Sequence, residues 1–231
     1  MQTDGQTECL AFLKEKALDF NYNYFRQFKD RIFDTDRFYF AEKLVVGVDM
    51  ENLTGKHIST GIFRKTVNSK NWAEATRRSG VSVVLTSLWN DLSTRPRIRK
   101  MMAELESIIR KRLRAESQGR DIFCERFREL QGLFQLSELE ADVLLIYHCL
   151  HTGMLVTPRD EKGKGIFKIQ EIARWMGKPA TQINRVFAAD QKLRRYQLID
   201  SSMEYNGDLD VYLYGLSDEP LEHKFYAQLK G

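Results

Sequence analysis

The chain has 231 residues, 42% of them hydrophobic and 29% charged, so it can bury a sizeable core and has an ordinary globular composition. Only four prolines occur, and no repetitive tract does, which excludes wholesale disorder. The formal net charge is +4, but residues 95–120 contain nine basic and three acidic residues, so this short segment supplies more than the whole excess.

The sequence carries no signal for export or for a membrane span. Residues 1–9 are polar and lack the basic-then-apolar order of a signal peptide. The longest apolar run covers residues 143–146, far short of the ~20 residues that a spanning helix needs. The chain has three cysteines, an odd number, and they lack the spacing of a disulfide framework: Cys9, Cys124 and Cys149. We therefore expect a cytoplasmic protein with reduced thiols and no membrane partner.

Two helices stand out in the first half of the chain. Apolar residues recur every three to four positions over residues 8–33, which predicts a long helix with an aromatic face. Residues 97–116 predict an amphipathic helix with one apolar face and a basic face opposite. Gly119 interrupts this second pattern, so we predict an α-rich domain over residues 1–120.

The region between these two helices has weaker patterns. Residues 38–48 and 58–67 have the composition of short strands. Residues 72–79 predict a helix. Residues 81–89 are apolar and fit either a strand or a buried helix, because periodicity alone does not separate the two.

The second half opens with a clear helix start. The Ser-x-x-Glu pattern from Ser137 is a capping box, in which each side chain satisfies a backbone N–H of the first turn. The helix is expected to run to about residue 151. Residues 168–176 predict another helix, with Gly177 as its C-cap, and Pro179 suits the first turn of a third.

Strand signals flank and follow these helices. Residues 166–167 can form a short strand, and residues 198–199 are expected to begin another. The Asn206-Gly207 pair is a strong hairpin-turn signal, because both residues tolerate positive φ. Apolar residues alternate after it, at Leu209, Val211 and Leu213.

This order of elements is that of a winged helix-turn-helix module. We therefore predict a mainly α fold with small β-hairpins (α+β), in which an N-terminal mostly helical domain is followed by a winged-helix module over residues 121–231. The hydrophobic core of the module is predicted to include Leu144, Ile172, Phe187 and Ile199.

Three segments of the second half resemble a known family. Residues 134–145, which read FQLSELEADVLL, are similar to the helix that opens the winged-helix region of bacterial AAA+ ATPases. Residues 193–200, LRRYQLID, resemble that family's entry into the wing. Residues 212–215, with Pro220-Leu221 after them, resemble the segment that precedes the ATPase core.

The resemblance implies a non-catalytic N-terminal region of an AAA+ ATPase, regulatory or partner-binding, that acts through protein–protein interaction. Its partner would be another protein, the ATPase core or further subunits of an oligomer. No G-x-x-x-x-G-K-[ST] loop occurs, and the pairs Gly55-Lys56, Gly163-Lys164 and Gly177-Lys178 all fail the pattern. ATP and magnesium are therefore expected only in an ATPase core outside this chain, and we predict no catalytic and no cofactor-binding residue.

One cluster contains residue types that bind metals. His148, Cys149 and His151 lie close together, and Cys124 could join them as zinc ligands. No C-x-x-C accompanies them, and Cys149 falls on the expected apolar side of its helix. We therefore predict no metal site.

The alternative function is binding of duplex DNA by the third helix of the module. Its outward residues would be Thr181, Gln182, Arg185 and Lys192, with Arg194 and Arg195 on phosphates. Against this reading, the expected wing carries the acidic residues Asp200, Glu204, Asp208 and Asp210, which would oppose a phosphate backbone. Protein interaction is therefore favoured. A weak, sequence-blind association with nucleic acid is assigned to the basic helix, through Arg110, Lys111, Arg112 and Arg114.

Overall fold

The computed structural model describes residues 10–27, 45–116, 121–155, 169–188, 191–199 and 204–216. Within these ranges the chain forms helices and no β-strand, and the only β-type pairing is one antiparallel bridge between Ile199 and Tyr205. None of the described helices is long and apolar enough to cross a membrane.

The chain divides into two compact units. Unit 1 comprises residues 1–27 and 113–231, and unit 2 comprises residues 28–112. A division at residue 120, as expected from the sequence, groups the first helix with the region that follows it. The first helix instead contacts the C-terminal helices, so residues from both ends of the chain build unit 1.

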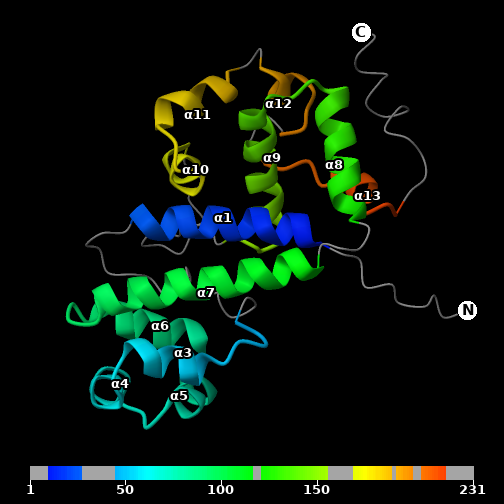
Figure 1. Ribbon diagram of the computed structural model, residues 1–231. Coiled ribbons are helices and arrows are strands. Elements are labelled where there is room, and N and C mark those ends of the chain that lie inside the picture. Colours follow the sequence, from blue (N-terminus) through cyan, green and yellow to red (C-terminus); the bar gives the residue numbers. More distant parts are fainter. Residues whose placement is uncertain are drawn as a thin grey trace, which may run out of the picture. The chain divides into compact units, whose positions relative to one another are not determined.

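Unit 2 is a set of short helices followed by most of a long one (Figure 1). They are α3 (Met50–His57), α4 (Thr60–Val67), α5 (Trp72–Ser79), α6 (Val81–Asn90) and α7 (Arg95–Glu116). The core is built from fully buried side chains of α6 and α7, among them Leu85, Leu88, Trp89, Ile98, Met101, Leu105 and Ile109. The amphipathic helix predicted over residues 97–116 is thus confirmed.

The strands expected in this region are wrong where the structure describes them. Most of the second expected strand, residues 60–67, forms α4, with Phe63 buried and Asn68 ending the helix in the left-handed conformation. Residues 81–89, for which the sequence left a strand and a buried helix open, form α6, so the helix alternative is confirmed; it buries Val84, Leu85 and Leu88, a spacing that fits a helix. Of the first expected strand, residues 38–44 lie outside the described ranges and residues 45–48 form a turn.

Unit 1 is built around α9 (Figure 1). Its helices are α1 (Ala11–Gln27), α8 (Ile122–Leu133), α9 (Glu138–His151), α10 (Ile169–Met176), α11 (Ala180–Val186), α12 (Lys192–Arg195) and α13 (Asp208–Leu213). α1 packs against α8, α9 and α10. Lys16 Nζ lies 2.7 Å from Asp142 Oδ1, and the ring of Tyr24 stacks on Trp175 with centroids 5.5 Å apart.

The helix starts and stops of this unit were well predicted. The capping box at Ser137 is complete, because Ser137 accepts from Glu140 N and Glu140 accepts from Ser137 N. Gly177 ends α10 with φ of 64°, and Pro179 is the N-cap of α11. The predicted core is confirmed at Leu144, Ile172, Phe187 and Ile199, all of which are buried. The rest of the first predicted helix and the strand at residues 166–167 lie outside the described ranges.

The main error of the sequence prediction is the wing. The predicted α+β class and the winged-helix module depend on it and are wrong as well. Gly207 has φ of −62° and ψ of −18°, which is helical, and α13 begins directly after it. Asn206 Oδ1 accepts from Asp208 N, and the acidic residues of the first turn suit the positive end of a helix. Leu209 and Leu213 are buried while Val211 is exposed, as on a helix. The described fold is mainly α, and residues 198–199 contribute only the bridge.

Candidate functional site

Unit 2 carries the positive charge of the molecule. Residues 45–112 contain 13 basic and 6 acidic residues, an excess of seven charges. By contrast, residues 121–155 of unit 1 contain six acidic and two basic residues. The two units therefore differ in electrostatic character, which the net charge of +4 conceals.

Four of the six described carboxylates of unit 2 accept hydrogen bonds from neutral donors. Asp49 accepts from Asn52 N, Glu51 from Trp72 N and Glu74 from Lys70 N, so they cap helices or fix a loop. Asp91 accepts from Ser93 and Thr66, and these hydrogen bonds lower its pKa. Such carboxylates do not form hydrogen-bonded pairs with the cations around them.

The other two described carboxylates of unit 2 pair with basic side chains. Glu104 lies 2.5 Å from Lys56 Nζ and 2.8 Å from His57 Nε2, and these contacts lower its pKa. Glu106 lies 2.7 Å from Arg110. Among the residues that the structure describes, seven exposed cations of unit 2 have no carboxylate partner: Arg64, Lys70, Arg77, Arg78, Arg97, Lys100 and Lys111.

The start of α7 is the densest part of this basic surface. Arg95, Arg97, Arg99 and Lys100 fall within six positions, and the first turn contains no acidic residue. Cations at the beginning of a helix oppose the helix dipole, at a cost of roughly 0.3–1 kcal/mol each when exposed. The sequence thus concentrates positive charge where the fold itself disfavours it.

Trp89 organises two of these arginines. Its side chain is fully buried, and the guanidinium carbons of Arg95 and Arg99 lie 5.7 and 5.5 Å from its ring centroid. Arg95 Nε also donates to the Trp89 carbonyl oxygen at 2.9 Å. The flexible arms of both arginines are therefore held in place before any ligand arrives.

The structure separates the four cations predicted near the end of α7. Arg110 pairs with Glu106, and Arg112 donates to the Val46 carbonyl oxygen, so both support unit 2 internally. Lys111 is exposed and remains a candidate contact. Arg114 is exposed too, but it belongs to unit 1.

The residues predicted for base and phosphate contacts are divided between surface and interior. Thr181, Gln182 and Arg185 are exposed on α11, and Arg195 is exposed on α12. Lys192 is half-buried, donates to the Gln135 carbonyl oxygen and lies 3.9 Å from Glu140. Arg194 is half-buried.

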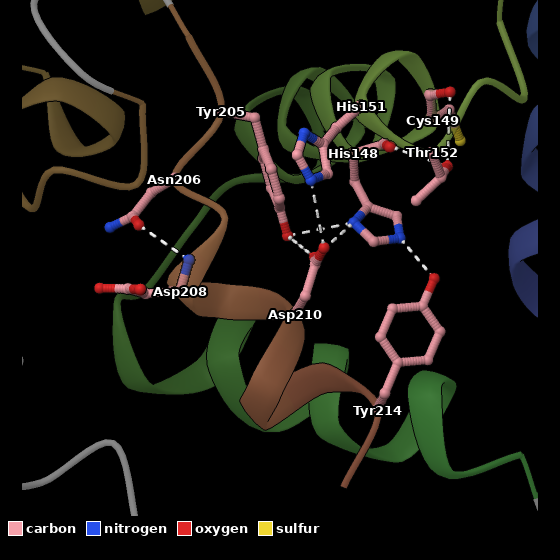
Figure 2. A network of polar contacts seen from close by, with 9 residues as sticks. All are labelled: His148, Cys149, His151, Thr152, Tyr205, Asn206, Asp208, Asp210 and Tyr214. Carbon is pink, nitrogen blue, oxygen red and sulfur yellow. Dashed lines mark hydrogen bonds and ion pairs between the residues drawn. The ribbon is translucent and has the colours of Figure 1, made fainter. Parts of the chain in front are cut away.

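A second cluster of polar side chains, made of two histidines, two tyrosines and one aspartate, lies inside unit 1 between α9 and α13 (Figure 2). His148 is almost completely buried, with Nδ1 3.1 Å from both Asp210 Oδ1 and Tyr205 Oη. Its Nε2 lies 2.9 Å from Tyr214 Oη. His151 Nε2 lies 3.5 Å from the other oxygen of Asp210. The acidic residue expected in a wing is thus enclosed by hydrogen-bonding partners.

The charges of this network follow from its contacts. Burial opposes ionisation of Asp210, but the hydrogen bonds from His148 and Tyr205 outweigh it and lower the pKa of Asp210. Burial, with the nearby Asp210 carboxylate, raises the pKa of the Tyr205 phenol. An ionised Asp210 beside a neutral Tyr205 is therefore the stable arrangement.

The cysteines take no part in a disulfide or a metal cluster in the described part of the chain. Cys149 is fully buried and Cys124 partly so, and both are free thiols whose pKa burial raises. No three His, Cys, Asp or Glu side chains are arranged to hold a metal ion among the described residues.

Sequence reasoning found the excess of charge but missed two parts of these sites. The contact of Trp89 with the arginines was not predicted. The signal in the sequence that could have indicated a basic cluster is the group of four basic residues in the first turns of α7. The partnership of His148 with Asp210 was not predicted either, since Asp210 was assigned to a wing. Comparisons with protein families, with curated proteins and with solved structures find no match for this chain.

Proposed function

We propose that this chain is a non-catalytic binding region whose unit 2 associates with nucleic acid through the phosphate backbone, without reading base sequence. The observation that carries the proposal is the set of seven exposed cations in unit 2 that have no carboxylate partner in the described structure. Neutralising phosphates with such side chains releases condensed counterions, which drives association with any nucleic acid.

The sequence-based argument against nucleic-acid binding depends on an acidic wing. That wing is replaced by α13, and Asp210 points into the network with His148 instead of projecting from a hairpin. The remaining electrostatic argument concerns each unit separately. Unit 2 has 13 basic residues against 6 acidic ones over residues 45–112, which favours a polyanionic partner.

Helix α11 is a weaker candidate for the contact than unit 2. It has seven residues, and its neighbour Lys192 is engaged with Gln135 and Glu140. The described residues form no wing, so they lack the second DNA contact that the wing of a winged helix makes beside its recognition helix. Sequence-specific readout by α11 is therefore not proposed.

The test is a fluorescence anisotropy titration of the full chain with a mixed-sequence duplex at about 50 and about 200 mM salt. We expect a dissociation constant of about 10⁻⁴ to 10⁻⁶ M near physiological salt, which weakens steeply as salt rises. Changing Lys100→Ala together with Lys111→Ala should weaken binding and flatten the salt dependence, by about 0.9 in the logarithmic slope for each lost phosphate contact.

The matched control removes the same number of charges from unit 1, by Arg185→Ala with Arg195→Ala. Both control residues are exposed, and binding should change little. Absence of binding at the lower salt concentration would refute the proposal. Loss of binding in the control variant alone would move the contact to unit 1.

A second proposal concerns the setting in which this binding operates. The resemblance of residues 134–145 to bacterial AAA+ proteins supports a regulatory or partner-binding region attached to an ATPase core, acting partly through protein contacts. Its support from the fold is that Ser137 and Glu140 start α9 as that segment predicts. The cytoplasm is the compartment we propose, because the thiols of Cys124 and Cys149 are free.

The ATPase proposal has a direct test in the coding sequence beyond residue 231. A Walker A loop there would support it. A continuous reading frame with another type of domain would refute it, without affecting the nucleic-acid proposal.

A further inference from the structure

We infer that a pocket in unit 2, formed by α3, the start of α4 and the start of α5, accepts one unpaired base of a single-stranded nucleic acid. The inference rests on the proposed binding of the phosphate backbone and adds the form of nucleic acid that unit 2 would take. A duplex keeps its bases stacked and paired, so only a single strand, a loop or an end offers a base to a pocket.

The size and the apolar lining of the pocket suit one flat ring. Its volume is about 260 Å³, which includes the space at its open mouth. This is less than the ~300–1,000 Å³ of pockets for drug-sized ligands, so a single ring-sized group fits it better than a larger molecule. The apolar lining consists of the buried side chains of Ile58, Phe63 and Trp72, and the two rings lie with centroids 6.5 Å apart. Aromatic side chains pack against the flat face of any base.

The polar part of the lining offers unused acceptors and donors side by side. Glu51 Oε2 accepts from two backbone N–H groups at the start of α5, which leaves its other oxygen without a partner among the described residues. Asn71 Oδ1 accepts from another N–H of that helix, while its Nδ2 donates to no described residue. The hydroxyl of Thr60, at the start of α4, has no described partner either.

This combination of polar groups favours a base over an aromatic amino-acid side chain. Every base has both donors and acceptors along the edge of a flat ring. By contrast, a tyrosine or tryptophan side chain has one polar group, and phenylalanine has none. A base can therefore satisfy several polar groups of the lining while its face lies on the apolar side chains.

The charge around the pocket favours a polyanion as the chain that carries the base. Lys70 lines the pocket, is exposed and has no carboxylate partner in the described structure. The two helices that contribute to the lining, α4 and α5, also carry Arg64, Arg77 and Arg78, which are exposed and likewise lack one. Cations around aromatic side chains are the combination with which proteins bind single strands. A free nucleotide brings one base and few phosphates to this surface, so we expect it to bind too weakly to saturate.

The test fills the pocket without removing a charge. Gly55 lines the pocket from α3, and a Cβ at this position would meet nothing within 4 Å. Gly55→Leu should therefore occupy the pocket, and replacing a glycine in the interior of a helix favours the helix. Thr60→Leu is a second variant, which narrows the same pocket from α4. Melting curves verify that each variant keeps its fold.

Binding is measured by fluorescence anisotropy of the full chain at about 50 mM salt, where weak electrostatic binding is strongest. The probes are a mixed-sequence single strand, an abasic strand with the same number of phosphates, and a mixed-sequence duplex. The unchanged chain should bind the single strand about tenfold more tightly than the abasic strand, through one stacked base. In Gly55→Leu and in Thr60→Leu, affinity for the single strand should fall to that for the abasic strand, while duplex binding stays unchanged.

The matched control is Gly61→Leu. Gly61 is an exposed glycine of α4 whose Cβ position also meets nothing within 4 Å, and it does not line the pocket. This control should bind all three probes as the unchanged chain does.

Equal affinity of the unchanged chain for the single strand and the abasic strand would overturn the inference and leave the proposed function standing. Normal single-strand binding by a folded Gly55→Leu chain would do the same. A peptide of glutamate and tyrosine is the fourth probe. If it binds the unchanged chain more tightly than the single strand does, and loses this binding in Gly55→Leu, the pocket takes a side chain of an acidic protein and the inference fails. If the unchanged chain binds no nucleic acid, the proposed function fails first.

Discussion

Asp210 Oδ1 lies 3.1 Å from His148 Nδ1, so a carboxylate of α13 orients a histidine that is buried in α9. A carboxylate only accepts hydrogen bonds, and Nδ1 must therefore carry a proton. In the neutral ring, Nε2 then accepts from the Tyr214 hydroxyl, 2.9 Å away. Asp210 also accepts from the Tyr205 hydroxyl at 2.9 Å, so one carboxylate satisfies two buried donors.

Removing this carboxylate should loosen the attachment of α13. In Asp210→Ala, the N–H of His148 and the hydroxyl of Tyr205 lose their acceptor, which we expect to cost about 1–3 kcal/mol in the free energy of unfolding. Denaturant unfolding measures the change. Asp208→Ala is the control, because Asp208 is exposed in the same helical turn and should cost about 0.3–1 kcal/mol through the helix dipole. Equal losses in the two variants would contradict a specific role for Asp210.

The effect of Asp210 should depend on pH in acid. Its folded-state pKa is lowered, so its contribution is present above the ordinary value of 3.8 and is lost as the pH falls through the folded pKa. The difference in unfolding free energy between the unchanged chain and Asp210→Ala should therefore shrink below about pH 3.8. A difference that stays constant down to full protonation would show that lost packing, and not charge, explains the variant.

Alkali should act on the same network through Tyr205. Burial raises the pKa of this phenol above its ordinary value of 10.0, so its contribution is complete below that pH and is lost as the pH rises beyond it. Tyr205→Phe cannot ionise, and it should be less stable than the unchanged chain at neutral pH. The two stabilities should converge above about pH 10. Parallel stability curves in alkali would refute this assignment.

Local signals were sufficient for part of this fold. Ser137 with Glu140, and Gly177 with Pro179, mark helix ends through hydrogen bonds and backbone geometry within a few residues, and the structure has these ends as predicted. The strand prediction at Leu209, Val211 and Leu213 was wrong, because an alternating apolar triplet also fits one face of a strand. Only tertiary burial of Leu209 and Leu213, with Val211 exposed, identifies the helix.

The candidate sites show the same difference between what local sequence signals predict and what only tertiary contacts reveal. The basic segment at residues 95–120 could be predicted from the sequence, because charge excess is a property of composition, but the cations of α4 and α5 that extend the surface were not predicted. The stacking of Arg99 on Trp89 depends on how α6 and α7 bring the two side chains together, ten residues apart in the chain. His148 and Asp210 are further apart still, and no short motif connects them.

The chain alone should not bind ATP specifically. No phosphate loop occurs in the sequence, and the Gly55-Lys56 pair lies within α3, where no glycine-rich loop surrounds it to cradle a phosphate. Calorimetric titration with ATP and magnesium at physiological salt should give only the heat of dilution. The titration is done at physiological salt because salt screens the weak, non-specific attraction between the cations of unit 2 and any polyanion. Saturable ATP binding under these conditions would contradict the prediction.

The core of unit 1 should depend strongly on Phe187. This side chain is 7% exposed, and its ring centroid lies 6.0 Å from that of Tyr147 in α9, so it joins the end of α11 to the central helix. Phe187→Ala should lower the free energy of unfolding by about 3–5 kcal/mol, because it removes a buried ring and leaves a cavity. Gln182→Ala is the control, since Gln182 is exposed on the same helix and should shift stability by less than about 0.5 kcal/mol. Thermal and denaturant unfolding of both variants measure the difference. An unchanged melting curve for Phe187→Ala would show that α11 does not pack on α9 in solution.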